Sequence, residues 1–377
     1  MREDERVKRT KVMQIIARMN VGGPAVIVAE LMRGLNKEEF EQILVTGYCD
    51  ENEADYLDEV ATDIQATRIA GLGRSVSPLA DLRAFLSLVK MIRTFKPDVI
   101  HTHTAKAGVL GRLASMLAGR RATRVHTFHG HLLHGYFAGW KTKLIITIEK
   151  FFASKTDVLV AIGTQVRDDL LAAGIGKENQ YKVFFPGLPT PADISRLDAR
   201  NQLGWSMDEI YVTFVGRLTQ IKRPDRLLDI AARVEGARFI IAGEGELFEE
   251  CKKRAVDENL PALFLGWRKD IDLILAASDI AILTSDNEGI PLTLIQAAFA
   301  GLPIVATRVG SISDIVIEGG NGFLLAPDAG AMARAVQELI NRPSLREAMG
   351  KAGREHAHRH FSLARMVKDH SDLYAQR

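Results

Sequence analysis

The sequence predicts an α/β protein made of two doubly wound domains, and three observations lead to this expectation. Short apolar runs alternate with amphipathic helical stretches along all 377 residues. Continuous apolar runs of this kind are typical of parallel strands that helices cover on both faces. A chain of this length has room for two cores, and one stretch rich in proline divides it near its middle.

The predicted strands are spread over both halves of the chain. They are residues 12–17, 42–47, 98–103, 123–128 and 157–162, then 211–216, 238–243, 262–267, 279–285 and 303–308. The segment 184–195, FFPGLPTPADIS, is the predicted linker. We therefore expect domains at 1–187 and 188–360, and the apolar spacing of the last residues predicts a terminal helix over 361–377.

Composition narrows the classes of protein to consider. The net charge of +2 argues against a broad basic face for nucleic acid. Cys49 and Cys251 stand far apart without metal-ligand spacing, which favours a reducing, cytoplasmic location. The first residues lack the pattern of a signal peptide. No apolar run approaches the ~18 residues of a spanning helix, so we expect at most peripheral contact with a membrane.

A basic loop follows the predicted strand 211–216. Arg217 and Lys222 stand in this loop, and Pro224 suits the first turn of the next helix. Two cations beside a helix N-terminus favour an anion, because free N–H groups and the helix dipole both attract negative charge. The alternative is a solvated basic loop without a ligand.

The loop after strand 279–285 has a similar form. Pro291 suits a first helical turn, which leaves the backbone N–H groups of Gly289, Ile290 and Leu292 near the helix start. Glu288 adds a carboxylate beside these donors. The pattern predicts a carboxylate for sugar hydroxyls and amides for phosphates.

The helix that follows is almost entirely apolar, which predicts a buried position. Thr293 and Gln296 are its polar residues, and their spacing places them on one face. A buried amide needs a hydrogen-bond partner. A ligand hydroxyl would serve, and so would the backbone of a neighbouring loop.

The first half of the chain offers a glycine turn and a group of histidines. Gly22 and Gly23 lie between the first strand and a helix, where a phosphate can approach the backbone closely, although this is not the GxGxxG pattern. The histidines of HTFHGHLLH are His126, His129, His131 and His134. No carboxylate or cysteine accompanies them, so a zinc site is disfavoured. His129, at the end of its strand, is the best placed toward a ligand.

Two further segments allow competing interpretations. Asp270 and Asp272 have the spacing of a metal-binding pair, but they more naturally begin a helix. The stretch 135–155 mixes aromatic residues with lysines: Phe137, Trp140, Phe151 and Phe152 with Lys141, Lys143, Lys150 and Lys155. Such mixing suits an anionic membrane surface. It also suits a helix with one core face and one solvated basic face.

Taken together, the segments resemble the family 4 retaining glycosyltransferases (glycosyl transferases group 1) of the GT-B fold, over essentially the whole chain. The segments that carry the resemblance are NVGGPAVIVAEL, HTHTAKAGVLGRLAS, HTFHGH, VGRLTQIKRPDRLL, IIAGEGEL and DNEGIPLTLIQAAFAGLPIVAT, with GSISDIVIEGGNGFLL after them. The resemblance implies two Rossmann-like domains that face a central cleft. The first is the acceptor-side domain, completed by the C-terminal helix, and the second binds the donor.

The resemblance also implies roles for individual residues in the donor site. Arg217 and Lys222 correspond to the pair that grips the donor diphosphate, and Glu288 corresponds to the carboxylate that holds the sugar hydroxyls. The amides of Gly289, Ile290 and Leu292 complete the phosphate site.

The resemblance also assigns roles to residues outside these two loops. Gly22 and Gly23 line the diphosphate, and His129 lies near the donor sugar. The base pocket corresponds to Leu265, Gly266, Trp267 and Arg268. Two features depart from the family pattern. Gln296 stands where the family has a second glutamate, which contacts the ribose, and the linker reads FPGLPT where Asn-Gly is common.

The implied reaction transfers a sugar from a nucleoside diphosphate to an acceptor hydroxyl with retention, without metal or cofactor. We expect a UDP-hexose or UDP-N-acetylhexosamine donor and a lipid-linked or surface-polysaccharide acceptor, at the inner face of the plasma membrane. Two alternatives remain at this stage. An epimerase of sugar nucleotides would change the sugar without transferring it, and a nonenzymatic nucleotide-sugar-binding protein would do neither.

Overall fold

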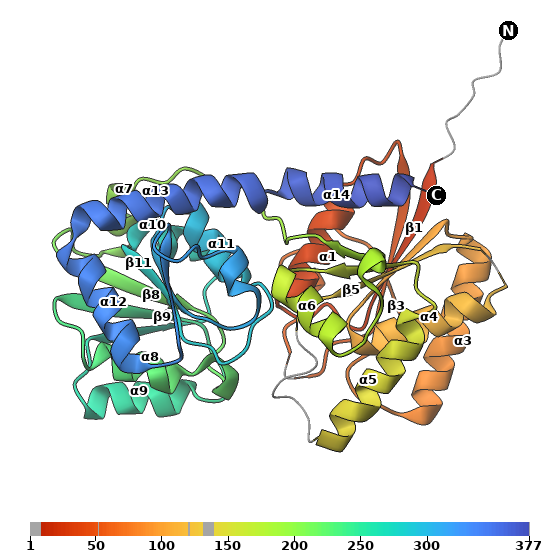
Figure 1. The fold of residues 1–377 in the computed structure, drawn as a ribbon, viewed down its shortest axis with the longest axis horizontal. Helices are drawn as coiled ribbons and strands as arrows, with labels where there is room; N and C mark the ends of the chain where they lie inside the picture. Colours follow the sequence, from red (N-terminus) through yellow and green to blue (C-terminus); the bar gives the residue numbers. More distant parts are fainter. Residues whose placement is uncertain (1–8, 52, 120, 131–138, 377) are drawn as a thin grey trace, which may run out of the picture. The chain divides into compact units, whose positions relative to one another are not determined.

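The computed structural model describes residues 9–51, 53–119, 121–130 and 139–376. The chain forms two compact units, each with its own parallel sheet (Figure 1). Unit 1 comprises Met1–Gly187 and Leu363–Arg377, and unit 2 comprises Leu188–Ser362. The predicted linker, 184–195, contains the point at which the chain leaves unit 1.

Unit 1 contains a seven-stranded sheet of order β3-β2-β1-β4-β5-β6-β7, and all of its strand pairs are parallel. Its strands are β1 (Thr10–Ile16), β2 (Phe40–Thr46), β3 (Ala66–Arg68), β4 (Val99–His103), β5 (Thr123–Phe128), β6 (Val158–Ala161) and β7 (Tyr181–Val183). Its helices are α1 (Gly23–Gly34), α2 (Tyr56–Glu59), α3 (Pro78–Phe95), α4 (Ala105–Leu117), α5 (Gly139–Ala153), α6 (Thr164–Ala172), the 3₁₀ turn η1 (Glu178–Gln180) and α14 (Leu363–Ala375).

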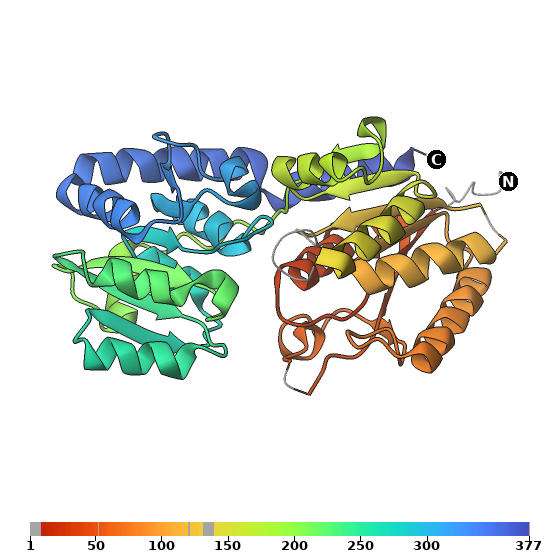
Figure 2. The same cartoon turned by 60° about the horizontal axis from the view of Figure 1, so that its bottom comes forward.

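Unit 2 contains a six-stranded parallel sheet of order β10-β9-β8-β11-β12-β13. Its strands are β8 (Ile210–Val215), β9 (Ala237–Ala242), β10 (Ala262–Gly266), β11 (Ile280–Leu283), β12 (Ile304–Thr307) and β13 (Gly322–Leu325). Its helices are α7 (Arg196–Leu203), α8 (Pro224–Ala231), α9 (Phe248–Asp257), α10 (Ile271–Ala277), α11 (Leu292–Phe299), α12 (Ala329–Asn341) and α13 (Pro343–His360), with 3₁₀ turns η2 (Gln220–Lys222) and η3 (Gly310–Asp314). Figure 2 shows helices on both faces of each sheet.

The predicted fold class is confirmed, since every strand expected from the sequence is present within a few residues of its predicted ends. The strands that the sequence reading missed are β3, β7 and β13, and each lies at the edge of its sheet. They are only three or four residues long. A run that short is too brief to show a strand periodicity.

Both strand orders reverse direction at one point, between β1 and β4 in unit 1 and between β8 and β11 in unit 2. In doubly wound sheets, ligands bind beyond the carboxyl ends of the strands at this switch point. The loops that follow β1, β4, β8 and β11 are therefore the places to look for a site.

The C-terminal helix α14 is part of the core of unit 1. Met366 packs with Ile27 and Leu31 of α1. Leu373 and Tyr374 belong to a second cluster, which contains apolar residues of β1, β2, β4, β5 and β6. One face of the unit 1 sheet is therefore closed by residues from the far end of the chain.

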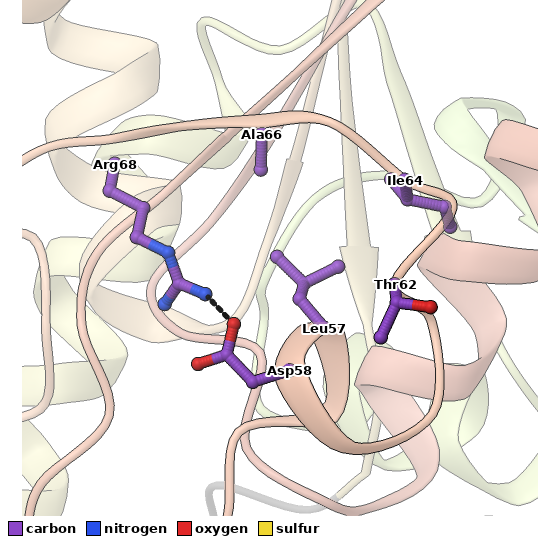
Figure 3. Close-up of a pocket in the computed structure, with 6 residues that line it drawn as sticks. All are labelled: Leu57, Asp58, Thr62, Ile64, Ala66 and Arg68. Carbon is purple, nitrogen blue, oxygen red and sulfur yellow. Dashed lines mark hydrogen bonds and ion pairs between the residues drawn. The ribbon is translucent and has the colours of Figure 1, made fainter.

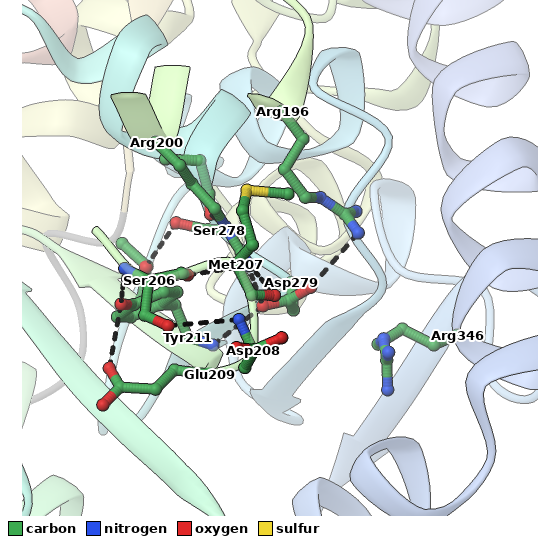
Figure 4. Close-up of polar contacts among 12 residues, drawn as sticks. Arg196, Arg200, Ser206, Met207, Asp208, Glu209, Tyr211, Ser278, Asp279 and Arg346 are labelled. Carbon is green, nitrogen blue, oxygen red and sulfur yellow. Dashed lines mark hydrogen bonds and ion pairs between the residues drawn. The ribbon is translucent and has the colours of Figure 1, made fainter. Parts of the chain in front are cut away.

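The first helix of unit 2 is attached by a buried charged contact, drawn in Figure 4. Arg200 of α7 donates to a carboxylate oxygen of Asp279 at 2.6 Å, and both side chains are buried. The same oxygen accepts the backbone N–H of Tyr211 at 2.8 Å, and Arg196 approaches the other oxygen at 3.2 Å. Because the carboxylate is satisfied on both sides, the pair fixes α7 against β8 without leaving an unpaired buried charge.

Candidate active site

The loops after β8 and β11 bring two predicted site residues together in unit 2. The two strands are hydrogen-bonded neighbours at the switch point. The ammonium of Lys222 lies 2.5 Å from a carboxylate oxygen of Glu288, and Ser285 donates to the same oxygen at 2.6 Å. Both charged side chains are mostly buried, which strengthens their attraction relative to an exposed pair.

Hydrogen bonds between the two loops hold this arrangement. The hydroxyl of Thr284 donates to the carbonyl of Lys222 at 2.9 Å. The backbone N–H of Asp286 donates to the carbonyl of Ile221 at 2.8 Å. The Asp286 carboxylate also accepts from Arg223 at 2.9 Å and from Arg226 at 2.7 Å. The sequence reading missed these supporting residues because their contacts join two loops that are 60 or more positions apart.

A glycine supports the Glu288 loop from behind. Gly310, at the start of η3, has φ of 52°. A Cβ atom at this position would lie 1.8 Å from the carbonyl oxygen of Glu288. The next residue, Ser311, donates its backbone N–H to the carbonyl of Gly289 at 3.2 Å. Only glycine fits here, for reasons of both conformation and space.

The start of α11 leaves three backbone donors available. Pro291 is the N-cap residue, one position earlier than the first-turn position expected from the sequence, and the helix begins at Leu292. The N–H groups of Gly289, Ile290 and Leu292 donate no hydrogen bond to another described residue. Free N–H groups at a helix start form a suitable site for an anion.

Arg217 differs from the other cations nearby. Its side chain is exposed immediately after β8, and it forms no ion pair within the described part of the chain. Arg223, six residues further on, is already paired with Asp225 and Asp286. Arg217 is therefore a cation available to a ligand.

The environment of Gln296 corrects the expectation of a fully buried helix. Its side chain is partly exposed on α11, and its amide donates to Asp272 of α10 at 3.4 Å. It also lines a groove of about 500 Å³ with Thr190, Arg196 and other residues. The partner is therefore a carboxylate, which is neither of the two partners considered from the sequence.

The predicted base segment spans the end of β10 and the start of the loop that leads to α10. The exposed Trp267 donates its backbone N–H to Glu244 at 3.3 Å, and Lys269 stands 5.2 Å from the centre of its ring. Arg268 is paired with Asp270, the N-cap residue of α10. Asp270 thus begins a helix, as expected, and Leu265 and Gly266 end the strand before it.

In unit 1, the glycine turn leads directly into α1. Gly22 is the N-cap residue and Gly23 opens the helix, with Pro24 in its first turn. The nearest atom to a Cβ built on Gly22 is 3.8 Å away. The turn at the β1 switch point is therefore open to close approach.

His129 stands at the carboxyl end of β5, and its partner is a histidine from the neighbouring strand. Nε2 of His129 lies 2.9 Å from Nδ1 of His103 at the end of β4. Nδ1 of His129 is buried and has no hydrogen-bond partner among the described residues. His126 is separate, because it lies on the other face of the sheet and contacts the hydroxyl of Thr102 at 2.8 Å.

The remaining histidines of the predicted cluster, His131 and His134, lie outside the described residues, as does Phe137. Among the residues that are described, no group of three or more metal-binding side chains is found. Burial lowers the pKa of His129 to about 3 and that of His370, on α14, to about 4. It also lowers the pKa of the buried histidines of β4 and β5, His101, His103 and His126, well below the usual value.

Unit 1 contains a separate hollow, and no predicted site residue lines it. It measures about 420 Å³ and is lined by Leu57, Asp58, Thr62, Ile64, Ala66 and Arg68. Figure 3 shows Arg68 and Asp58 directed toward one another across it. This ion pair, at 2.9 Å, leaves no free charge in the hollow for a ligand.

Known proteins resemble this chain over most of its length. The model of the glycosyl transferases group 1 family matches residues 195–356, and that of the glycosyl transferase 4-like domain matches residues 22–185. The putative glycosyltransferase EpsD of Bacillus subtilis is 30% identical over 316 residues, 78% of this chain and 81% of that protein. An Escherichia coli enzyme, UDP-Gal:alpha-D-GlcNAc-diphosphoundecaprenol alpha-1,3-galactosyltransferase, is 30% identical over 339 residues, 85% of each chain.

Solved structures show the same fold. Anabaena HepE, crystallised with UDP and glucose, has a TM-score of 0.82 at 21% identity and covers 98% of this chain and 100% of its own. The fold and the site thus define a GT-B glycosyltransferase. The chain belongs to the glycosyl transferases group 1, family 4, as the sequence motifs predicted.

Proposed function

We propose that this glycosyltransferase moves a hexose or N-acetylhexosamine from a UDP-linked donor to a hydroxyl of a lipid-linked or surface-polysaccharide precursor, with retention. The observation that carries the proposal is the pairing of Lys222 with Glu288 at the switch point of unit 2. The name of the E. coli relative specifies a UDP-galactose donor and an acceptor on diphosphoundecaprenol. The HepE structure holds UDP and glucose.

The charged residues suit a leaving diphosphate. An ammonium has three donor hydrogens, so Lys222 can bind Glu288 and still donate to phosphate oxygens. Arg217 adds an exposed guanidinium that forms no ion pair with another described residue. The amides of Gly289, Ile290 and Leu292 add neutral donors. We propose that these groups supply the positive potential that the departing charge requires, without a metal ion or cofactor.

The bond changes follow from this arrangement. The bond between the sugar C1 and the phosphate oxygen breaks, and the acceptor oxygen bonds to C1 on the same face. The acceptor hydrogen passes to the departing diphosphate. We propose that Glu288 holds hydroxyls of the reacting sugar, that His129 contacts the same sugar, and that Gly22 and Gly23 line the diphosphate. Gln296 contacts the ribose, and the segment Leu265–Arg268 receives the base.

Ligand-induced stabilisation combined with product analysis tests the function. A nucleotide that binds only the native state raises the melting temperature. We expect UDP and UDP-hexoses to raise it more than GDP or ADP analogues. We also expect transfer to a diphospholipid-linked sugar in the presence of EDTA, with an α-linked product from an α-linked donor. Release of an epimerised nucleotide sugar, or binding without turnover, would contradict the proposal.

We further propose that unit 1 contacts an anionic membrane surface. No helix in the described parts of the chain has the length and apolar character to cross a membrane. On α5, however, Leu144, Ile148 and Phe151 form an exposed apolar row, with the exposed Lys143 and Lys150 on the same helix. Phe152, which the sequence analysis grouped with Phe151, is buried. An apolar row beside lysines is typical of interfacial helices.

Vesicle sedimentation tests this contact. Replacing Leu144, Ile148 and Phe151 by serine should lower binding to vesicles of anionic phospholipid about tenfold, because the apolar contact is lost while the lysines remain. Serine replacements of Leu79, Leu82 and Leu86, which are exposed on α3, provide the matched control. Equal binding of the α5 variant and the wild type would remove α5 from the contact.

A further inference from the structure

A chain of buried polar groups joins His129 to the C-terminal helix within unit 1. Nε2 of His103 lies 2.9 Å from Oε1 of Gln14 on β1. The amide nitrogen of Gln14 donates to the hydroxyl of Tyr374 on α14 at 3.1 Å. The same hydroxyl lies 2.5 Å from Nδ1 of His101.

The chain ends at β5, where Nε2 of His101 lies 2.6 Å from the hydroxyl of Thr127. Strand register explains why these groups meet. Gln14 is paired with His101, and His103 with Thr127, so alternation places all four side chains on one face of the sheet. This is the face that Tyr374 covers.

The orientation of the Gln14 amide sets the direction of these hydrogen bonds, because its nitrogen faces Tyr374 and its oxygen faces His103. A neutral imidazole has one donor and one acceptor nitrogen, and a phenol has one hydrogen to donate. The histidines are neutral, because burial lowers the pKa of each of them. The hydroxyl oxygen of Tyr374 accepts from the amide nitrogen of Gln14, so the hydroxyl donates its hydrogen to Nδ1 of His101. The amide oxygen of Gln14 then faces His103.

The remaining hydrogens are then determined. His103 donates from Nε2 to the amide oxygen of Gln14, so its Nδ1 is an acceptor. His129 must donate from Nε2 to that acceptor, which leaves Nδ1 of His129 with a free lone pair. A reversed Gln14 amide would reverse every one of these bonds and place a hydrogen on Nδ1 of His129.

We propose that Tyr374, acting through Gln14 and His103, holds His129 in the tautomer whose Nδ1 is a hydrogen-bond acceptor. Tyr374 and Gln14 are thus positioning residues. The use of this acceptor rests on the proposed function: it receives a hydroxyl hydrogen of the donor sugar. Three histidines take part in this row of hydrogen bonds: His101, His103 and His129. Of their ring nitrogens, Nδ1 of His129 is the one that has no partner among the described residues.

Nuclear magnetic resonance of histidine-labelled protein tests the tautomer without any substrate. The ring ¹⁵N and Cδ2 ¹³C shifts distinguish the two neutral forms, and the resonances of His129 are assigned by their loss in His129→Asn. We expect His129 in the wild type to carry its hydrogen on Nε2. Tyr374→Phe and Gln14→Met should each convert it to a mixture of tautomers, because each cuts the chain.

Thr102→Val is the matched control, since it removes the buried partner of His126, which lies outside the chain. It should leave the His129 signals unchanged. The double variant of Gln14 and Tyr374 should do no more than either single change, because both act through one connection. A wild-type hydrogen on Nδ1, or an unchanged His129 in Gln14→Met, would overturn the proposal.

Titration calorimetry then tests whether Nδ1 of His129 contacts the donor sugar, independently of the tautomer assignment. UDP-galactose should bind Gln14→Met about tenfold more weakly than the wild type, while UDP, which lacks the sugar, binds both equally. An altered tautomer with unchanged UDP-galactose affinity would refute the contact with the sugar and leave the tautomer assignment standing. Failure of the wild type to bind either nucleotide would refute the UDP donor, and the spectra would still decide the role of Tyr374.

Discussion

The two switch points of this glycosyltransferase use opposite electrostatics. At the switch point of unit 2, charged side chains lie together: Lys222 meets Glu288 in a mostly buried pair, and Arg217 is exposed. At that of unit 1, the histidines are buried and neutral, and they are joined to one another through neutral side chains. Unit 2 is therefore suited to binding charge, whereas unit 1 is suited to orienting hydrogen-bond donors and acceptors. Changes in pH and in charge should affect the two regions differently.

The largest expected effect is a loss of stability in acid, caused by the buried histidines. The unfolded chain binds protons near pH 6.5, while the native state binds them at His129 and His370 only near pH 3 and 4. Stability is therefore full above pH 6.5 and is lost as the pH falls toward these values. Between pH 7 and 5 each histidine should lower the free energy of unfolding by about 2 kcal/mol.

Urea unfolding at the two pH values measures this effect. His370→Gln should reduce the pH dependence by one histidine's share, whereas replacement of the exposed His358 by glutamine should leave it unchanged. A free energy of unfolding that is the same at pH 7 and pH 5 would show that these histidines are not held neutral.

The next largest effect should come from the carboxylate of unit 2. Glu288→Gln keeps the size of the side chain but removes the charge that we propose holds the reacting sugar, so kcat should fall by roughly 10²–10³. Affinity for UDP should be kept, because Lys222 remains. Steady-state kinetics measure the change in kcat, and calorimetry measures the affinity for UDP. A variant that loses UDP affinity but keeps kcat would place Glu288 with the phosphates instead of the sugar.

Arg217→Ala should have a smaller effect, confined to binding. Loss of a charge-assisted hydrogen bond should weaken UDP binding roughly ten- to a hundredfold. Arg223→Ala is the control, because that guanidinium is already paired with Asp225 and Asp286 and should change UDP affinity little. Similar losses in both variants would indicate a general effect of loop charge instead of a specific contact.

The smallest change is expected at Gln296. If its amide contacts the ribose, Gln296→Leu should raise the donor KM about tenfold, the equivalent of ~1.4 kcal/mol, with little change in kcat. Gln296→Glu should keep activity and lower KM, unless the nearby Asp272 opposes the added charge. Asp272→Asn removes that opposition and is therefore the companion variant. The same KM in every form would leave the amide as a structural partner of Asp272.

The sequence predicted the central strands well, because burial on both faces makes their residues apolar. The central strands lie between helices, so their residues are apolar without interruption, and their positions were predicted within a few residues. The Arg217, Lys222 and Glu288 loops were predicted because they carry unusual residues at strand ends. Whether they act as assigned stays a prediction.

What sequence reading missed depends on contacts between distant residues. Gln14 and Tyr374 lie 360 positions apart, and neither stands in a recognisable motif. A signal was nevertheless present: Gln14, His101 and His103 are polar residues within mostly apolar strands, at positions that share one face. The support that Gly310 gives to Glu288 was equally hidden, since it depends on a close backbone approach.

The division of unit 1 into two stretches of chain has a consequence for biosynthesis. Residues 188–362 form a continuous unit that can close as soon as it leaves the ribosome. Residues 1–187 emerge earlier, yet the helix that covers one face of their sheet is made only after residue 362. The domain translated first is thus completed last. A stalled or shortened product would carry a finished unit 2 and a unit 1 whose sheet has an uncovered apolar face, a target for chaperones or proteases.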